Sequence, residues 1–186
     1  MKILALGHRK QTGKDTLARF IASRLRLNNR GLNVIVAGFA DELKDTVYRL
    51  YGWAGVKPKE YYEAHQAERE VILPQIGMSY RAKLIQIGNH TRAIDECVWS
   101  NALLKKLNVD VLIIKDLRFP HEITQVHSCG GHVVKVVRPG IPEDTDGADE
   151  PLATFNEWDH IVVNDGDLNK LNQAADFLIQ KFKLGN

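Results

Sequence analysis

The first twenty residues, MKILALGHRKQTGKDTLARF, constrain the fold more than any other stretch of the chain. The apolar run from Lys2 to Leu6 is typical of a strand buried on both faces, and Leu17, Phe20 and Ile21 recur after it at helical spacing. Between them lies a basic loop that contains two glycines. Strand, glycine-containing loop and helix in this order predict a phosphate-binding P-loop, because backbone N–H groups converge on an anion at a helix N-terminus.

The loop follows the pattern G-x-x-x-x-G-K-[ST] with two departures. His8 stands where the pattern has its first glycine, and Asp15 stands in place of the hydroxyl residue, with Thr16 next. We expect Lys14 to reach the β- and γ-phosphates of a nucleotide, and Asp15 or Thr16 to contact Mg²⁺. The alternative is a solvated turn between strand and helix.

The rest of the chain alternates apolar runs with helical patterns, which predicts an α/β fold with parallel strands and right-handed crossovers. Further strands are predicted over residues 34–37, 109–114, 132–137 and 161–163. The helical region from Tyr80 to Leu107 is expected to break or bend at Gly88 and Asn89. We expect one domain, residues 1–186, with a mobile insertion at about 52–79 and a mobile acidic flap at about 141–157.

Composition excludes several function classes. The formal net charge of +2 is too small for a protein that coats nucleic acid. No apolar stretch approaches the ~20 residues that span a membrane, so we expect a cytoplasmic protein. Cys97 and Cys129 have neither a disulfide framework nor a metal-ligand spacing, and are expected to be buried.

Ligands of parallel α/β sheets bind at the carboxyl ends of the strands, and several charged residues are predicted to lie there. These ends carry Asp41 and Lys44, then Asp116, Arg118 and Glu122, then Arg138, with Arg81 and Arg92 added from the long helical region. Arginine binds phosphate through two parallel hydrogen bonds and neutralises charge during phosphoryl transfer. For each residue the alternative is an ion pair or a solvated helix face.

The segments GHRKQTGKDT, FADELK, LIQIGNHTR, DLRFPHE, VVRPG and HIVVNDGDLNKL occur in the order seen in bacteriophage deoxynucleoside monophosphate kinases. The chain resembles this family over nearly its whole length, apart from the insertion Gly52 to Ser79 and the flap. The resemblance implies a P-loop NTPase fold of the NMP-kinase type, with three layers and a five-stranded parallel sheet. It also implies the reaction dNMP + ATP → dNDP + ADP, with Mg²⁺ bound to ATP.

The resemblance also implies roles for individual residues. The catalytic residues would be Lys14, Arg118 and Arg138. ATP would be bound by Gln11, Thr12, Gly13, Lys14, Asp15, Thr16, Asn164 and Gly166, with Asp15 and Thr16 nearest the metal. The acceptor nucleotide would be bound by Lys10, Asp41, Lys44, Arg81, Gly88, Asn89, Arg92, Trp99, Asp116, Arg118, Glu122 and Glu150.

The sequence leaves other functions open. A P-loop kinase of another phosphorylated acceptor, such as dephospho-coenzyme A or phosphomevalonate, has a similar loop. A third hypothesis is a P-loop nucleotide-binding regulator that transfers no phosphoryl group. Asn89 stands where the family often has threonine, which bears on base selectivity. The expected partners are ATP and a deoxynucleoside monophosphate, without nucleic acid or membrane, in the host cytoplasm if the protein is viral; a homodimer is left open.

Overall fold

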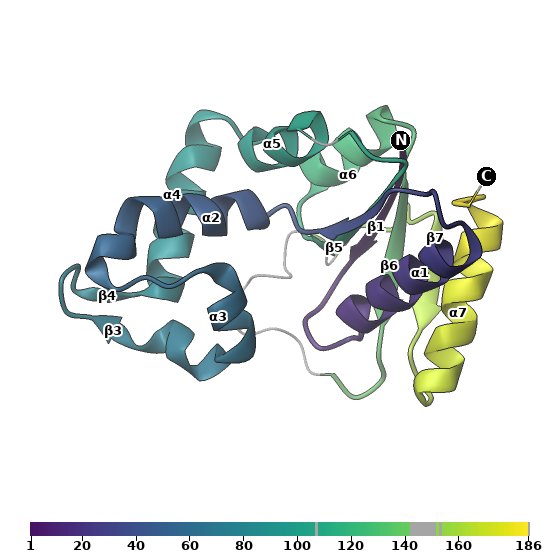
Figure 1. Cartoon of the computed structure of the whole chain (residues 1–186), viewed down its shortest axis with the longest axis horizontal. Coiled ribbons are helices and arrows are strands. Elements are labelled where there is room, and N and C mark those ends of the chain that lie inside the picture. The colour runs from purple at the N-terminus through teal and green to yellow at the C-terminus, as the bar shows by residue number, and fades with distance from the viewer. Residues whose placement is uncertain (107, 142–151, 153, 186) are drawn as a thin grey trace. The chain divides into compact units, whose positions relative to one another are not determined.

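The computed structural model describes residues 1–106, 108–141, 152 and 154–185. The chain forms two compact units (Figure 1). The first consists of Met1–Gly38 and Leu107–Asn186, and the second of Phe39–Lys106.

The first unit is built on a five-stranded sheet with strand order β2-β5-β1-β6-β7. Its strands are β1 (Lys2–Gly7), β2 (Val34–Ala37), β5 (Val111–Leu117), β6 (His132–Val137) and β7 (His160–Val163). All neighbours pair in parallel, so the carboxyl ends lie at one edge of the sheet. The predicted strands are therefore confirmed, with small shifts at the ends of β1, β5 and β7.

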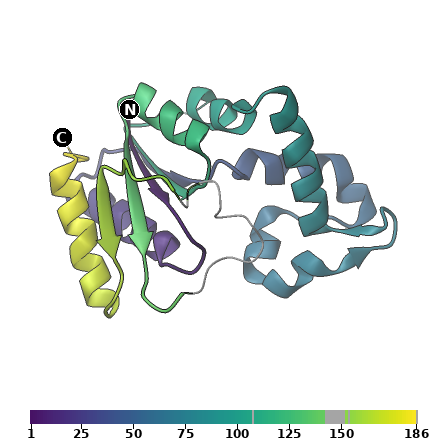
Figure 2. The same cartoon turned by 180° about the vertical axis from the view of Figure 1, so that it is seen from behind.

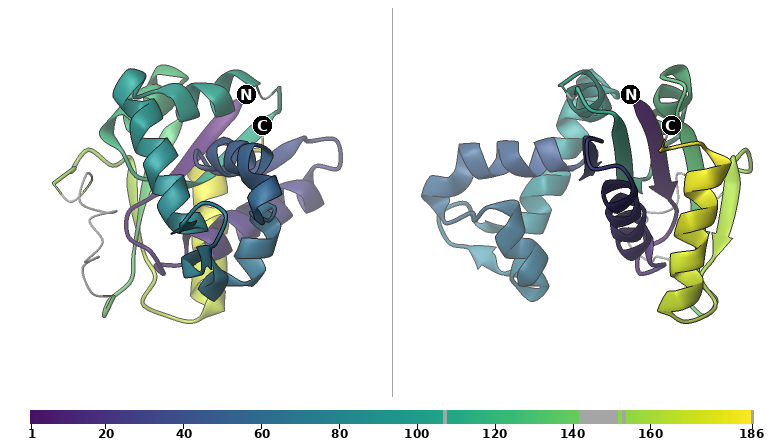
Figure 3. Two further views of the ribbon diagram at one scale, coloured as in Figure 1. Left: turned by 90° about the vertical axis from the view of Figure 1, so that its left-hand side faces the viewer. Right: turned by 45° about the vertical axis from the view of Figure 1, so that its right-hand side comes forward.

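Helices cover both faces of this sheet, as the near-continuous apolar strands require. Helices α1 (Lys14–Asn28) and α7 (Leu168–Lys181) lie side by side on one face (Figures 1 and 3). Helix α6 (Pro120–Ser128) packs on the opposite face, where Val126 lies near Ile3 (Figure 2). The result is the three-layer α/β fold of P-loop proteins, as predicted.

The second unit is mainly helical. Its elements are α2 (Asp41–Tyr51), η1 (Gly52–Ala54), α3 (Lys59–Ala64), η2 (Gln66–Glu70), the β3–β4 hairpin (Ile72–Leu73 and Met78–Ser79), α4 (Tyr80–Ile94) and α5 (Val98–Lys106). Its core contains Leu43, Val47, Val56, Tyr62 and Tyr80. The rings of Tyr62 and Tyr80 stack with their centroids 3.8 Å apart.

Two predictions from the sequence are wrong. Helix α4 continues through Gly88 and Asn89, and the break comes later, where Asp95 Oδ1 accepts a hydrogen bond of 2.9 Å from the Cys97 amide. Cys129 is exposed at the end of α6, and Cys97 is only partly buried.

The segment 52–79 contains η1, α3, η2 and the β3–β4 hairpin, and its expected mobility stays a prediction. Most of the flap predicted at 141–157, with Glu150, lies outside the described residues. Within the part of the chain that the structure describes, no helix has the length and apolar character needed to cross a membrane.

Candidate functional site

The loop between β1 and α1 has the backbone shape of an anion-binding P-loop. His8, Gln11 and Gly13 have positive φ angles of 86°, 59° and 98°. Gly13 is left-handed and Lys14 begins the helix, a sequence of conformations that turns successive N–H groups toward one side. His8 adopts the left-handed conformation that glycine would take without strain, so this departure from the pattern keeps the loop shape at a cost in backbone energy.

The ammonium of Lys14 lies inside this loop. Nζ donates to the carbonyl oxygens of His8, at 3.0 Å, and Arg9, and lies 3.4 Å from Thr12 Oγ1. The Lys14 side chain is buried, and Thr12 Oγ1 donates to the Arg9 carbonyl oxygen at 3.1 Å. The loop therefore surrounds one positive charge placed directly before the α1 N-terminus, where a phosphate is bound in P-loops.

The His8 imidazole is neutral at pH 7. Burial, and after it the charges of Lys135, Arg9 and Lys14, lower the pKa of His8 to about 4. Within the described residues, His8 Nδ1 is buried without a hydrogen-bond partner. The position where the pattern has glycine therefore adds no charge to this cationic loop.

Asn164, far from the loop in sequence, holds the loop in place. Asn164, directly after β7, donates from Nδ2 to the Thr12 carbonyl oxygen at 2.9 Å. A Cβ on Gly13 would lie 2.5 Å from the same nitrogen, so only glycine fits under this amide. The predicted contact of Asn164 with ATP stays a prediction, whereas its contact with the loop backbone is a structural role that the sequence did not indicate.

A tryptophan packs against the start of the loop. A Cβ on Gly7 would lie 2.7 Å from the Trp158 ring, and Trp158 Nε1 donates to the Phe155 carbonyl oxygen at 2.9 Å. Gly7 is therefore required for close packing of the indole on the β1 end. Trp158 was not predicted from the sequence, because no local pattern links it to the loop.

Two lysines of the neighbouring strands add positive charge near the loop. Gly7 of β1 is in register with Leu117 of β5 and with Lys135 of β6. Lys115 Nζ lies 3.9 Å from Asp15 Oδ1. Neither lysine was predicted from the sequence. A lysine near the carboxyl end of a buried parallel strand does, however, indicate a ligand-binding position, because ligands bind at that edge of such sheets.

The carboxylates of Asp116, near the end of β5, and of Glu122, in the first turn of α6, have defined structural contacts. A Cβ on Gly38 would lie 2.5 Å from Asp116 Oδ2, so the Asp116 carboxylate lies against the chain at the end of β2. Glu122 is buried, and its Oε2 accepts from the backbone amides of Arg118, at 2.7 Å, and Phe119, at 3.1 Å. The motif DLRFPHE thus fixes its own backbone, and the predicted contacts of these residues with an acceptor stay predictions.

The remaining predicted residues of the first unit lie along the same edge. Lys10 and Gln11 belong to the loop, Thr16 is in the first turn of α1, Arg138 follows β6 and is exposed, and Gly166 packs against Lys170. The first unit therefore brings together the predicted ATP-binding residues with Asp116, Arg118 and Arg138 at the carboxyl ends of its strands.

Asp15 and Thr16 suit a magnesium ion that is held mainly by phosphates. The Asp15 carboxylate is 71% exposed in the first turn of α1, next to the hydroxyl residue Thr16. Magnesium with a nucleotide commonly takes one or two protein oxygens and fills its octahedron with phosphate and water. Among the described residues there is no group of three His, Cys, Asp or Glu side chains that could hold a metal ion.

In the second unit, predicted residues of α2 and α4 are held by acidic partners. Lys44 Nζ lies 3.0 Å from Asp41 Oδ1 and 3.8 Å from Glu63 Oε1. Arg81 Nε lies 3.5 Å from Glu70 Oε1. These ion pairs are partly exposed, so each contributes roughly 1 kcal/mol or less to stability and serves mainly to orient the cation.

Farther along α4, Arg92 Nη2 donates to Asn89 Oδ1 at 2.8 Å, beside Gly88. Trp99 of α5 donates from Nε1 to Thr91 Oγ1 at 3.0 Å and packs against the core of the second unit. The indole of Trp99 is therefore held by its own unit, and its predicted nucleotide contact stays a prediction.

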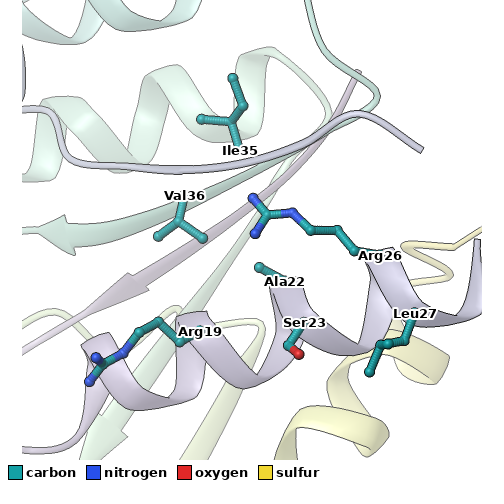
Figure 4. Close-up of a pocket in the computed structure, with 7 residues that line it drawn as sticks. All are labelled: Arg19, Ala22, Ser23, Arg26, Leu27, Ile35 and Val36. Atoms are coloured by element: carbon teal, nitrogen blue, oxygen red, sulfur yellow. The ribbon is translucent and has the colours of Figure 1, made fainter. Parts of the chain in front are cut away.

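A pocket of about 610 Å³ lies along α1 and β2, and none of the predicted site residues lines it (Figure 4). Arg19, Ser23 and Arg26 line it over an apolar floor that includes Val36. The guanidinium of Arg26 donates to the Val34 carbonyl oxygen at 2.6 Å, at the edge strand of the sheet. This pocket contains none of the residues that carry the P-loop chemistry.

Comparisons with known proteins gave one curated relative and two solved structures that are similar to this chain. A protein of Acanthamoeba polyphaga mimivirus, provisionally named as a deoxynucleotide monophosphate kinase, is 24% identical and covers 88% of this chain and 89% of its own length. Among solved structures, shikimate kinase from Aquifex aeolicus matches with a TM-score of 0.46 and 15% identity over the full length of both chains. A kinase of provisional name from Chloroflexus aurantiacus matches with a TM-score of 0.41 and 14% identity, over 100% of this chain and 97% of its own.

The model of the family described as deoxynucleotide monophosphate kinase matches residues 85–175. This range begins in α4 and ends in α7, and it includes Asn89, Trp99 and the motif DLRFPHE. The chain thus matches the deoxynucleotide monophosphate kinase family over residues 85–175, and the resemblance that its motifs indicated is confirmed.

Proposed function

We propose that the protein transfers the γ-phosphoryl group of ATP to a deoxynucleoside monophosphate, giving a deoxynucleoside diphosphate and ADP. The observation that carries the proposal is the Lys14 ammonium held inside the P-loop, at the carboxyl edge of a sheet that also carries Asp116, Arg118 and Arg138. The family match over residues 85–175 supports a deoxynucleotide as the acceptor.

Positioning and charge neutralisation account for this chemistry. The P-loop N–H groups and Lys14 bind the ATP phosphates. Lys14 also stabilises the negative charge that develops on the phosphoryl group during transfer. Arg118 and Arg138 bind phosphate oxygens through their planar guanidinium groups. Asp15 and Thr16 would hold a Mg²⁺ ion that binds with ATP, and that ion would supply neutralisation of phosphate charge. A strong base on the protein is not needed, because the acceptor is an anionic phosphate.

The neutral state of His8 fits this role. A charged imidazole inside the loop would lose solvation through burial and would also repel Lys135, Arg9 and Lys14, and both effects lower the pKa of His8. The positive charge of the loop therefore comes from Arg9, Lys10 and Lys14 and not from His8. We place this activity in the cytoplasm, the host's if the protein is viral.

A coupled ADP-release assay tests the proposal. The wild-type protein with ATP and Mg²⁺ is given each of the four deoxynucleoside monophosphates, the ribonucleotides, dephospho-coenzyme A and phosphomevalonate. We expect turnover with at least one deoxynucleotide at a kcat/KM well above that for the other acceptors. Turnover only with another acceptor would show that the protein is a kinase of that acceptor and that the proposal is wrong. ATP binding without transfer to any acceptor would indicate a nucleotide-binding regulator. Light scattering with and without both nucleotides decides the oligomeric state.

A further inference from the structure

The pocket along α1 and β2 follows the outer edge of the sheet (Figure 4). Strand β2 stands at one end of the strand order, so one of its edges has no neighbour among the described strands. Ile35 and Val36 both line the pocket, although successive side chains of a strand lie on opposite faces of the sheet. A pocket that contacts both side chains therefore passes along the edge of β2 that has no partner strand.

The backbone at this edge directs hydrogen-bonding groups away from the sheet. The carbonyl of Asn33, directly before β2, accepts from the amide of Asp110, directly before β5, at 3.0 Å. Because successive residues of a strand direct their N–H and C=O groups to opposite sides, Val34 and Val36 direct theirs away from β5. The bond of 2.6 Å from Arg26 Nη2 to the Val34 carbonyl oxygen agrees with this direction. The outer edge of β2 therefore presents the groups with which a further strand pairs.

One face of α1 adds two guanidinium groups to the pocket. Arg19, Ser23 and Arg26 are spaced three and four residues apart, which places them on one side of the helix. Arg19 Nε donates to the Asp15 carbonyl oxygen at 3.3 Å, as Arg26 does to that of Val34. Within the part of the chain that the structure describes, neither arginine forms an ion pair. Backbone carbonyls thus orient both guanidinium groups, and no carboxylate of the described residues neutralises them.

We propose that the outer edge of β2 binds an extended acidic peptide of a partner protein, with carboxylates of the peptide on Arg19 and Arg26. The main chain of the peptide pairs with Val34 and Val36, as in other cases of strand addition to a sheet edge. Alternate side chains of such a peptide lie about 7 Å apart on one face. The two arginines are about 10 Å apart along the α1 axis, a difference that their long side chains can span. The intervening side chains face Ile35, so the peptide alternates acidic and apolar residues.

Charge and backbone chemistry disfavour two other occupants of this edge. Helix α1 carries Arg19, Arg24 and Arg26 and one acidic residue, Asp15. The β2 edges of two copies of this chain would therefore bring like charges together, which opposes their pairing. A nucleic acid would satisfy the arginines, but it has no peptide groups that continue the hydrogen bonding of a sheet. An acidic segment of another protein satisfies both the guanidinium groups and the strand edge.

The experiment titrates ¹⁵N-labelled protein with the capped peptide Glu-Val-Glu-Val-Glu at physiological salt and follows each backbone amide by NMR. We expect the amide signals of Val34 and Val36 to shift and their hydrogen exchange to slow. The amide of Ile35, which faces β5, should change less. The peptide Glu-Glu-Glu-Val-Val has the same composition and charge without the alternation. It is the control for unspecific attraction and should bind about fivefold more weakly, because its side chains do not match the two faces of the edge.

Variants of α1 and β2 test the two parts of the site separately. Arg19→Gln and Arg26→Gln should each raise the Kd of the alternating peptide about 3–5-fold, the range of an exposed ion pair. The matched control is Arg24→Gln, on the same helix but outside the pocket, where Arg24 lies 3.5 Å from Asp176. Val36→Pro removes an outward N–H group at an edge position that tolerates proline, and should also weaken binding. If this variant does not fold, the amide shifts of the wild-type protein decide the point.

Several outcomes would overturn this inference. They are equal affinity for the two peptides, an unchanged Kd in the double variant Arg19→Gln/Arg26→Gln, and no shift of Val34 and Val36 at about 1 mM peptide. Shifts of these two amides that depend on protein concentration without peptide would assign the edge to a second copy of the chain. The same shifts with single-stranded DNA and not with the peptide would assign it to nucleic acid. Because the titration uses no nucleotide, its result is independent of the proposed kinase activity.

Discussion

At His8, an L-residue is held in a left-handed backbone conformation and its ring is partly buried beside three cations. Each of these conditions has a cost: the backbone is in a region that glycine occupies more readily, and protonation of the ring is suppressed. Strain of this kind persists only where the surrounding structure fixes it, and at this position it preserves the P-loop shape.

The first prediction concerns acid stability. The pKa of folded His8 is about 4, below the ordinary 6.5, so between these values the unfolded chain binds a proton that the folded protein does not. Wild type should therefore lose stability, relative to His8→Asn, as the pH falls from 7 toward 4. Asparagine tolerates the left-handed conformation and does not titrate. Urea unfolding of both proteins at several pH values measures the difference, and a difference independent of pH would contradict it.

The second prediction concerns Glu122, whose carboxylate accepts two backbone N–H groups at the start of α6. Glu122→Ala leaves these amides without this acceptor and should lower the free energy of unfolding by about 1–3 kcal/mol. Glu122→Gln keeps an amide oxygen and should retain most of the stability. Chemical denaturation of both variants tests this, and equal stability of all three proteins would show that the contact contributes little.

At the scale of elements, the shape of the P-loop is held by β1, α1 and the end of β7, which meet at the loop. Lys14 bonds the loop from inside, and Asn164 bonds it from the far end of the chain. A short loop with several left-handed residues has little intrinsic preference for one shape, so these two contacts determine its geometry.

Lys14→Met should lower kcat by about 10²-fold or more, because it removes a group that stabilises charge on the transferred phosphate. Its α1 packing through Leu17 and Ile21 stays intact, so circular dichroism should show a folded protein. Lys170→Met, an exposed lysine paired with Asp165 on the surface, is the matched control. Near-normal turnover in Lys14→Met would remove Lys14 from the chemistry.

Asn164→Leu should weaken ATP binding and lower the free energy of unfolding by about 1 kcal/mol, since it removes the amide that holds the Thr12 carbonyl. Calorimetry with ATP and urea unfolding measure the two effects. An unchanged stability with weaker ATP binding would indicate that Asn164 contacts the nucleotide directly, as the resemblance implies.

The sequence predicted the strands well because parallel strands buried on both faces appear as unbroken apolar runs. It placed the break of the long helix wrongly, because Gly88 serves close packing against Leu43 and Arg92, which only the tertiary structure reveals. Contacts such as Trp158 on Gly7 and Asn164 on Thr12 join distant segments and leave no local pattern.

On the scale of the whole molecule, the chain divides into a sheet unit and a helical unit, and each contains a hydrophobic cluster of its own. The second unit is continuous in sequence, whereas the first is made of two segments on either side of it. Units with clusters of their own are expected to open as separate cooperative blocks.

Val47→Ala, in the core of the second unit, should lower the protection of amides in that unit by roughly 2 kcal/mol and leave β1, β5 and β6 unchanged. Val136→Ala, in the sheet core, is the matched control. It should lower the protection of amides in the first unit and leave those of the second unit unchanged. Native-state hydrogen exchange measures both. Equal loss of protection everywhere in either variant would mean that the chain unfolds as one block.

The central position of β1 in the sheet also has a consequence for biosynthesis. This strand leaves the ribosome first, but its partner β5 follows roughly a hundred residues later, and β6 later still. At typical translation rates of about 5–20 residues per second, the segment ILAL has no sheet partner for several seconds. The helical unit emerges in the meantime and depends on nearby contacts, so it can form before the sheet does. The nucleotide loop, completed only when Asn164 arrives, is among the last features that the nascent protein acquires.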